Sequence, residues 1–306
     1  MVALSAANIA EAGQLVEPLF RNTPQFHDPV LDQRLGRELV LKVETLNPLG
    51  SFKGRGASYF VRGLEPGREV VCASAGNFGQ GIAYAAAARG IPVTVFTAEN
   101  ANAGKVARMR SFGADVKQFG ADFDVAKDAA REYAAVDGRL FVEDGEAPAI
   151  AEGAGTIGVE LVPLDLDTLL VPVGNGALIA GIGCYLKAHG ARTRIIGVCA
   201  AGAPAMLRSW HDRTPVTTES VDTMADGIAV RVPVPAAVGW MLEYVDDMLA
   251  VEEATIGRAM RLLRETTGQL VEPSAAAGIA ALLEHEIPGE RTGTIITGRN
   301  YLRETG

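Results

Sequence analysis

Apolar, β-branched stretches alternate with amphipathic, alanine-rich stretches from about residue 38 to the C-terminus. The apolar stretches predict strands over residues 38–44, 70–73, 92–97, 115–119, 140–143, 168–173, 194–199 and 293–297. The amphipathic stretches predict helices over residues 79–89, 103–112, 124–136, 156–162, 178–189, 203–211 and 255–266. Alternation of strands and helices over this length is typical of a parallel sheet with helices on both faces. We therefore expect an α/β fold.

The chain gives no sign of domains arranged one after the other. Its 306 residues suffice for one large domain or two modest ones. The sequence contains no internal repeat, no low-complexity tract and no linker rich in proline and serine. If two domains exist, their segments must be interwoven.

The overall composition limits the kinds of partner. A hydrophobic fraction of 48% argues against disorder, and a formal net charge of −9 argues against nucleic acid or an anionic membrane as the main partner. An anionic ligand must therefore be bound locally, by backbone amides and a few side chains.

Cysteine and histidine indicate neither a metal site nor a catalytic triad. Cys72, Cys184 and Cys199 are odd in number, far apart and outside any metal-ligand spacing, which favours buried residues in a reducing compartment. The four histidines are scattered. No basic segment precedes the first apolar run, and no apolar stretch has the length to span a membrane, so we expect a cytoplasmic protein.

The first loop with candidate chemistry spans residues 47–56. It follows a strand and leads into a short apolar run, and Ser51 is placed to cap a helix there. Lys53 would lie near the positive end of the helix dipole and beside Arg55, and both effects favour the free amine, which can attack an aldehyde. A solvated surface lysine is the alternative interpretation of this loop.

The second loop, residues 74–81, connects a strand to an alanine-rich helix. Its small residues let backbone amides converge on a ligand, and the helix N-terminus favours an anion. We therefore predict a carboxylate site formed by Ser74, Ala75, Gly76 and Asn77. A tight turn without a ligand is the alternative.

The third loop, again between a strand and a helix, is Gly174-Asn175-Gly176-Ala177-Leu178. A dinucleotide-binding fingerprint needs a third glycine where this chain has Ile179, and the Gly-Lys-Ser/Thr ending of a P-loop is missing. A short glycine-rich cup at a helix N-terminus suits one phosphate monoester. Together the three loops offer a reactive lysine, a carboxylate site and a phosphate site, which pyridoxal 5'-phosphate (PLP) with an attached amino acid requires.

These motifs resemble those of the fold-type II PLP enzymes, and within them the serine/threonine dehydratase group, which includes threonine deaminases and serine racemase. The resemblance runs from about residue 20 to the C-terminus. Its matched segments are Ser51-Phe52-Lys53 (the Schiff-base motif), residues 74–81 (the substrate-carboxylate loop), 174–178 (the phosphate loop), 225–230, 271–274 and 297–300. The chain departs from the group where Phe78 replaces a histidine, where Arg299 replaces a glycine, and where Asn175 and Ala177 replace two glycines.

The resemblance implies a tryptophan synthase β-like fold of two interwoven open α/β domains, with the cofactor in the cleft between them. A large domain would comprise residues 1–67 and 147–306, and a small mobile domain residues 68–146. Lys53 would be the catalytic residue and would hold PLP as a Schiff base. The other implied cofactor contacts are Phe52, Asn77, Gly174, Asn175, Gly176, Ala177, Leu178 and Thr297, with the Thr297 hydroxyl facing the pyridine nitrogen.

The implied activity is elimination of ammonia from a small β-hydroxy amino acid, such as threonine, serine or 3-hydroxyaspartate, to give a 2-oxo acid. A racemase, a β-replacement enzyme or a threonine synthase would share the scaffold. A catalytically silent binding protein and a nucleotide-dependent oxidoreductase are alternatives from other classes, disfavoured by the presence of Lys53 and of Ile179 respectively.

Further expectations concern metal and assembly. The stretch 199–205 lacks the carboxylates that bind metal in some relatives, so we expect no metal ion. We also expect a homodimer, without the regulatory domain that some threonine deaminases carry.

Overall fold

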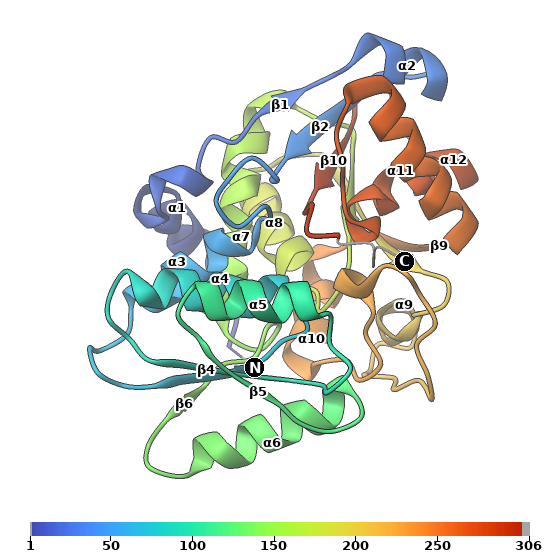
Figure 1. Cartoon of the computed structure of the whole chain (residues 1–306). Helices are drawn as coiled ribbons and strands as arrows, with labels where there is room; N and C mark the ends of the chain where they lie inside the picture. Colours follow the sequence, from blue (N-terminus) through green and yellow to red (C-terminus); the bar gives the residue numbers. More distant parts are fainter. Residues whose placement is uncertain (1, 302–306) are drawn as a thin grey trace.

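Within residues 2–301, which the computed structural model describes, two β-sheets form the frame of the molecule (Figure 1). The larger sheet has six strands in the order β1-β2-β10-β7-β8-β9. Their bounds are Gln25–Phe26 (β1), Leu39–Val43 (β2), Thr292–Ile296 (β10), Thr168–Pro172 (β7), Arg194–Ala200 (β8) and Asp247–Val251 (β9). Strand β1 pairs antiparallel with β2 at the edge, and the other neighbours pair parallel.

The smaller sheet comes from one continuous part of the chain. Its four parallel strands have the order β5-β4-β3-β6. Their bounds are Asp115–Gln118 (β5), Val93–Thr97 (β4), Val70–Ala73 (β3) and Leu140–Phe141 (β6). The larger sheet takes strands from before and after this segment, so the two units are interwoven. We propose residues 68–146 as the smaller domain and residues 1–67 and 147–306 as the larger one.

Helices cover both faces of each sheet (Figure 1). The α-helices span Ala6–Leu15 (α1), Pro29–Leu35 (α2), Lys53–Arg62 (α3), Asn77–Ala87 (α4), Ala103–Ser111 (α5), Phe123–Ala135 (α6), Pro148–Leu161 (α7), Ala177–Ala188 (α8), Ala205–His211 (α9), Pro235–Tyr244 (α10), Glu253–Thr267 (α11) and Ala277–Glu284 (α12), and the 3-10 helices span Pro18–Phe20 (η1), Val162–Leu164 (η2), Asp226–Ile228 (η3) and Pro273–Ala276 (η4). Around the smaller sheet, α4 and α5 lie on one face and α6 on the other. The larger sheet lies between α7, α8 and α10 on one side and α2, α11 and α12 on the other.

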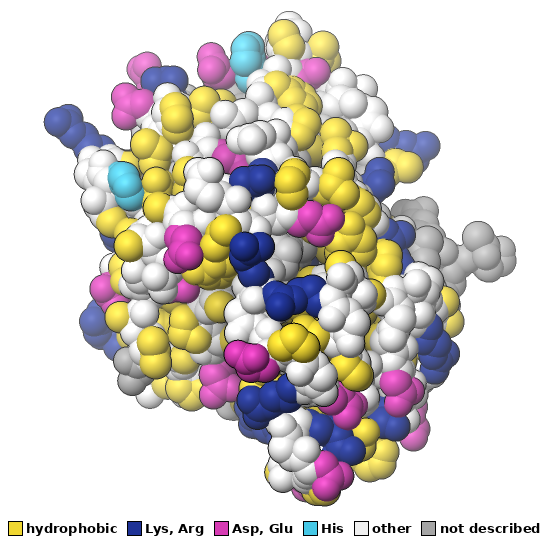
Figure 2. All heavy atoms as spheres, turned by 90° about the vertical axis from the view of Figure 1, so that its left-hand side faces the viewer, with side chains coloured by type: hydrophobic (Ala, Val, Ile, Leu, Met, Phe, Trp, Pro, Cys, Tyr) yellow, Lys and Arg dark blue, Asp and Glu magenta, His cyan; other side chains and the backbone are white. Residues whose placement is uncertain are grey.

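The outer surface is mixed in character. On the face shown in Figure 2, acidic and basic side chains are interspersed with each other and with small groups of apolar ones. Among the described residues, no helix combines the length and the apolar character needed to cross a membrane.

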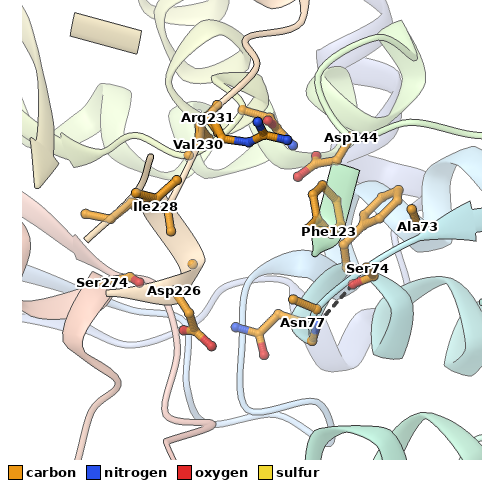
Figure 3. A pocket seen from close by; sticks show the side chains of 18 of the residues that line it. Ala73, Ser74, Asn77, Phe123, Asp144, Asp226, Ile228, Val230, Arg231 and Ser274 are labelled. Carbon is orange, nitrogen blue, oxygen red and sulfur yellow. Dashed lines mark hydrogen bonds between the residues drawn. The ribbon is translucent and has the colours of Figure 1, made fainter. Parts of the chain in front are cut away.

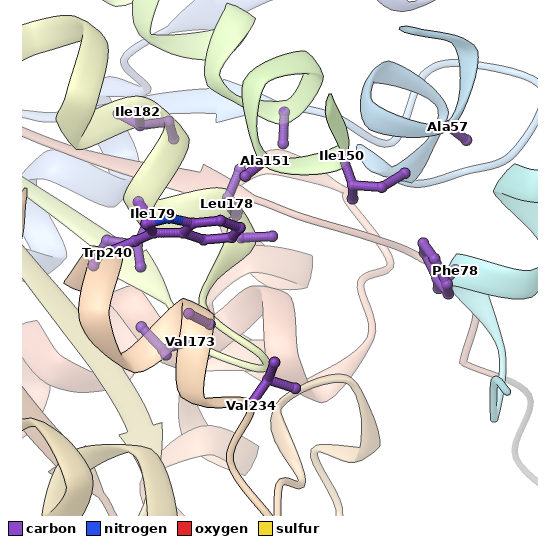
Figure 4. Packing of buried hydrophobic residues seen from close by; sticks show 14 of the residues in the cluster. Ala57, Phe78, Ile150, Ala151, Val173, Leu178, Ile179, Ile182, Val234 and Trp240 are labelled. Carbon is purple, nitrogen blue, oxygen red and sulfur yellow. The ribbon is translucent and has the colours of Figure 1, made fainter. Parts of the chain in front are cut away.

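Close packing between α7 and α8 fixes the position of α8. A Cβ atom on Gly155 of α7 would lie 2.7 Å from the Gly181 carbonyl oxygen of α8, so the two backbones can approach closely only because these residues are glycines. Near the start of α8, Leu178 and Ile179 belong to the same buried cluster as Trp240, which is 1% exposed (Figure 4). The N-terminus of α8 is therefore held rigidly by its packing against α7 and against Trp240 of α10.

A buried ionic cluster joins β2, α3 and α7, and it contains Arg55. Its guanidinium donates to the Glu44 carboxylate (2.8 Å) and to Glu160 (2.6 Å), and Lys42 Nζ lies 2.5 Å from Glu160. Burial by itself would lower the pKa of Arg55, but the carboxylates of Glu44 and Glu160 raise it above its usual value. The expectation that Arg55 acts on Lys53 is wrong, because its charge is neutralised inside this cluster.

The predicted strands agree with the observed ones to within two residues at either end. Strands β1 and β9 and helices α1, α2, α10 and α12 were not predicted, and the helix expected at residues 156–162 is the last part of α7. Helix α12 reads AGIAALLE and is apolar around most of its circumference, so it lacks the polar face that reveals an amphipathic helix. Strand β1 has only two residues, too few to form a pattern.

Candidate active site

A cavity of about 540 Å³ is lined by residues from the segment that forms the smaller sheet and from the segments that form the larger sheet (Figure 3). Segments that follow β3, β6, β7 and β10 form its wall together with the start of α3. The cavity thus lies at the carboxyl ends of parallel strands, which is where open α/β sheets bind ligands. Every residue predicted for the site lies in this wall: Phe52, Lys53, Ser74, Ala75, Gly76, Asn77, Gly174, Asn175, Gly176, Ala177, Leu178 and Thr297.

Lys53 is the first residue of α3, and its side chain lines the cavity. Phe52 occupies the N-cap position, and its N–H donates to the Thr297 carbonyl (3.1 Å), which ties the lysine loop to the end of β10. The prediction that Ser51 caps this helix is wrong: its Oγ is buried without a hydrogen-bond partner among the described residues. Lys53 Nζ lies 2.5 Å from Asp144 Oδ2 and 4.7 Å from the centre of the Phe52 ring.

The loop after β3 presents backbone amides and a hydroxyl at the N-terminus of α4. Ser74 Oγ accepts hydrogen bonds from the N–H groups of Gly76 (3.1 Å) and Gly79 (2.8 Å), which stabilises the first turn of the helix. A serine hydroxyl that accepts two hydrogen bonds can still donate one. Ala75 is exposed at the cavity wall. Because the N-terminus of this eleven-residue helix carries a partial positive charge, the loop can receive a carboxylate.

Asn77 is held by two residues from the C-terminal part of the chain. Its Nδ2 donates to both carboxylate oxygens of Glu272 (2.9 and 3.0 Å), and its Oδ1 accepts from Asn300 Nδ2 (2.8 Å). Burial raises the pKa of the Glu272 carboxyl, and the hydrogen bonds from Asn77 oppose that rise. No role was predicted for Glu272 or Asn300 from the sequence, although both lie in matched segments.

The cup at the start of α8 is shaped by two glycines. Gly176 stands at the N-cap with φ 88°, a left-handed conformation, and a Cβ there would lie 2.8 Å from Met241 Sδ. A Cβ on Gly174 would lie 2.6 Å from the Gly227 carbonyl oxygen. The N–H groups in the first turn of a helix have no acceptor within the helix. The cup therefore offers free amides at the positive end of a helix dipole, and its two glycines tolerate no side chain, which suits a phosphate.

Comparisons with known proteins agree with this geometry. Residues 16–298 match the family described as "Pyridoxal-phosphate dependent enzyme". The L-threonine ammonia-lyase of Thermotoga maritima is 35% identical over 303 residues, which cover 97% of this chain and 76% of that protein. The chain belongs to the PLP-dependent enzymes.

Solved structures narrow the family to its serine/threonine dehydratase group. A threonine deaminase from T.th. superposes with a TM-score of 0.92 at 31% identity, covering 98% of this chain and 99% of that one. A maize serine racemase superposes with a TM-score of 0.91 at 28% identity, covering 98% and 94% of the two chains. The fold is that of the fold-type II PLP enzymes, as the motifs indicate.

The residues present fit the family's cofactor. The Lys53 side chain lines the cavity, and the cup at α8 brings the backbone of residues 174–178 to the cavity wall with glycine at two positions that tolerate no Cβ. Two buried polar atoms in the cavity wall, Ser274 Oγ and Asp144 Oδ1, have no hydrogen-bond partner among the described residues. Such atoms are costly to bury alone, so their presence here indicates a ligand that interacts with this wall.

Two ion pairs at the cavity link helices beside the smaller sheet to the segment 226–231, and neither was predicted. Lys105 of α5 contacts Asp226 of η3, and Arg231 lies 2.6 Å from Asp124 of α6. No sequence pattern links these residues, because each pair forms between segments more than 100 positions apart. Asp144 could have been singled out, since it follows a predicted strand at its carboxyl end.

Two residues that differ from the related enzymes, Phe78 and Arg299, lie in different surroundings. Phe78 is buried in the cavity wall, with its ring centre 5.8 Å from Lys53 Nζ. Arg299 is exposed, its N–H donates to the Gly50 carbonyl (2.9 Å), and it is not among the residues that line the cavity. Within residues 2–301, no group of three or more His, Cys, Asp and Glu side chains is arranged to hold a metal ion.

Proposed function

We propose that this protein is a PLP-dependent ammonia-lyase that converts a small β-hydroxy amino acid to a 2-oxo acid and ammonia. Threonine and serine are the proposed substrates, with 3-hydroxyaspartate as a related one. The observation that carries the proposal is the presence, in one cavity, of the Lys53 amine, the loop at residues 74–77 and the cup at the start of α8. The likeness to the L-threonine ammonia-lyase and the threonine deaminase supports this substrate class.

Each end of the cofactor has a proposed partner. Lys53 would hold it covalently between Phe52 and Asn77, and the amides of residues 174–178 would bind its phosphate. When bound, PLP supplies the electron sink that makes the α C–H of the attached amino acid acidic. Thr297 would face the pyridine nitrogen. Because a hydroxyl is a far weaker acid than a carboxylic acid, Thr297 would leave that nitrogen unprotonated, which favours elimination over transamination.

The protein's own groups bind and deprotonate the substrate. The Ser74 hydroxyl, the amides at Ala75 and Gly76, and Asn77 hold the carboxylate, which aims the α C–H at Lys53. The free Lys53 amine then takes the proton: the C–H bond breaks and an N–H bond forms. The β-hydroxyl then leaves as water, with a proton that the phosphate in the cup at α8 would supply, and hydrolysis of the remaining product gives the 2-oxo acid and ammonia.

Contacts between the two domains keep water away from this step. The pairs Lys105–Asp226 and Arg231–Asp124 each join the small domain to the large one beside the cavity. Exclusion of water strengthens the electrostatic interactions inside the site and prevents side reactions.

A screen of L-amino acids that follows 2-oxo acid, ammonia and the D-enantiomer together tests the proposal. We expect 2-oxo acid and ammonia from threonine or serine, and undiminished activity with a chelator present. The D-enantiomer should form roughly 10²-fold more slowly, because the methyl group of Ala75 can neither donate nor accept a proton on the face opposite Lys53. A D-enantiomer that forms as fast as the 2-oxo acid would make the enzyme a racemase. No 2-oxo acid from any β-hydroxy amino acid would refute the proposal.

We also propose that the enzyme is a cytoplasmic homodimer. All three cysteines are free and buried, which supports a reducing compartment. Sedimentation equilibrium of the holoenzyme would test the dimer, since a mass equal to one chain of 32.1 kDa contradicts it.

A further inference from the structure

Asp144 is the hydrogen-bond partner of Lys53, and it lies outside the motifs that the chain shares with its family. It stands in the loop between β6 and α7, whereas Lys53 begins α3. Lys53 Nζ and Asp144 Oδ2 are 2.5 Å apart, with side chains 18% and 12% exposed. Figure 3 shows the Asp144 side chain at the cavity, beside Phe123 and Arg231.

The other charged groups near Asp144 already have partners. Lys127 Nζ lies 3.1 Å from Glu143 and 3.6 Å from Asp124, and Arg231 also contacts Asp124. The second oxygen of Asp144, Oδ1, is buried without a partner among the described residues. The contact with Lys53 is therefore the ionic interaction that Asp144 makes at the cavity.

The remaining surroundings of Lys53 Nζ are aromatic. The ring centres of Phe52 and Phe78 lie 4.7 and 5.8 Å away, within the range of a cation–π interaction. Phenyl rings accept no strong hydrogen bond. A positive charge on Lys53 Nζ is therefore stabilised mainly by the carboxylate of Asp144, which is in direct contact with it.

We propose that Asp144 is a positioning residue for the reaction: it orients Lys53 Nζ and stabilises the positive charge that Lys53 gains from the substrate. The inference rests on the proposed function. In the proton transfer, the α C–H bond breaks and its electron pair stays on the substrate, for which PLP, when bound, would supply the electron sink. The proton joins the lone pair of the neutral Lys53 amine, which becomes an ammonium beside the carboxylate.

The timing of this charge decides the effect on rate. Displacement by the substrate amine would release Lys53 from the cofactor, and the added proton would bring the charge on Nζ only during the proton transfer. An interaction that is stronger in the transition state than in the ground state lowers the barrier. The carboxylate of Asp144 makes such an interaction, because its attraction for Nζ grows as the proton is transferred.

Three variants of the holoenzyme test the assignment. Asp144→Asn removes the charge and keeps the shape, and Asp144→Glu keeps the charge. Asp115→Asn is the matched control, because it removes the carboxylate of an exposed Lys–Asp pair (Lys117, 3.1 Å) in the same small sheet. The first readout uses no substrate: the pH midpoint of the change in visible absorption of the lysine-bound cofactor. The second is kcat and KM for 2-oxo acid formation.

For Asp144→Asn we expect the midpoint to move down by about one pH unit or more, since a nearby carboxylate favours the protonated form of the lysine-bound cofactor. We expect kcat to fall roughly 10- to 100-fold with KM changed less than about threefold, because the charge acts in the transition state. Asp144→Glu keeps the charge, so its midpoint should lie close to the wild-type value. Asp115→Asn should match the wild type in both readouts.

Two results would overturn the assignment. In one, Asp144→Asn leaves both the midpoint and kcat at wild-type values. In the other, Asp144→Glu shifts the midpoint as far as Asp144→Asn does, so that the charge is not the cause. If the wild type releases no 2-oxo acid from any β-hydroxy amino acid, the proposed function fails, but the substrate-free titration still decides the role of Asp144.

Discussion

At the scale of single residues, the proposed reaction uses one of three lysine side chains that line the cavity. Lys53, Lys105 and Lys127 all line it. Each has an anionic partner: Asp226 for Lys105, Glu143 and Asp124 for Lys127, and Asp144 for Lys53. Of the three, Lys53 alone begins a helix and has two aromatic ring centres near its Nζ, at 4.7 and 5.8 Å. The position of Lys53, between the carboxylate loop and the phosphate cup, favours it as the cofactor's anchor.

We predict that PLP is bound covalently to Lys53. Reduction with borohydride followed by peptide mapping should place the cofactor adduct on the peptide that contains Lys53. Lys53→Ala should abolish turnover, because it removes both the anchor and the base. An adduct on Lys105 or Lys127 would show that Lys53 is not the residue that binds PLP covalently.

At the scale of elements, α8 contributes its N-terminus to the site and is fixed by its packing against α7. The cup there depends on backbone geometry, so bulk should disturb it more than the loss of a side chain. Gly176→Val adds a β-branched side chain at φ 88°, directed at Met241 Sδ. Gly190 lies just beyond the other end of the same helix with φ 69° and nothing within 4 Å of an added Cβ.

We predict that Gly176→Val weakens PLP binding roughly tenfold or more, whereas Gly190→Val does not. Both changes carry a similar backbone strain of about 1–2 kcal/mol, so their difference isolates the effect on the cup. Asn175→Gly should be mild, because the proposed contacts are made by the backbone. Cofactor occupancy after gel filtration and PLP titration of the apoenzyme measure the effect. Full occupancy in Gly176→Val would place the phosphate elsewhere.

At the scale of the whole molecule, the buried cluster around Arg55 connects the sheet, the lysine helix and α7. Burial by itself would raise the pKa of Glu160, but Arg55 and Lys42 lower it below its ordinary value of 4.5. A carboxyl whose pKa is depressed by folding stabilises the protein above its unfolded-state pKa. That contribution is lost as the pH falls from about 4.5 through the lower folded-state pKa.

We predict that Glu160→Gln lowers the free energy of unfolding at pH 7 by about 3 kcal/mol, since it leaves Arg55 and Lys42 with one carboxylate fewer in a buried cluster. Between pH 7 and pH 4 the variant should lose less stability than the wild type. Denaturant unfolding at the two pH values measures this. Glu265→Gln is the control, because its pair with Arg34 is exposed and should contribute less than about 1 kcal/mol. A wild type and variant with equal pH dependence would contradict the assignment to Glu160.

Local order in the chain made the α/β class and the three loops predictable. A strand, a glycine-rich turn and a helix are consecutive in sequence, so the pattern around Gly174–Leu178 reveals both the cup and the helix that follows it. The same holds for the Ser74 loop. Elements that lack a local pattern were missed, such as the two-residue β1 and the uniformly apolar α12.

The sequence by itself determined the fold class, the order of most elements from residue 38 onward and the three loops that line the cavity. Only the tertiary structure decided which side chains meet across the cavity. Asp144 reaches Lys53 over 91 positions and Glu272 reaches Asn77 over 195, while Arg55, two residues from Lys53, points into a separate ionic cluster. The physical reason is that periodicity and turn chemistry are local, whereas ion pairs and hydrogen bonds in a cleft form between segments that only the packing of two sheets brings together.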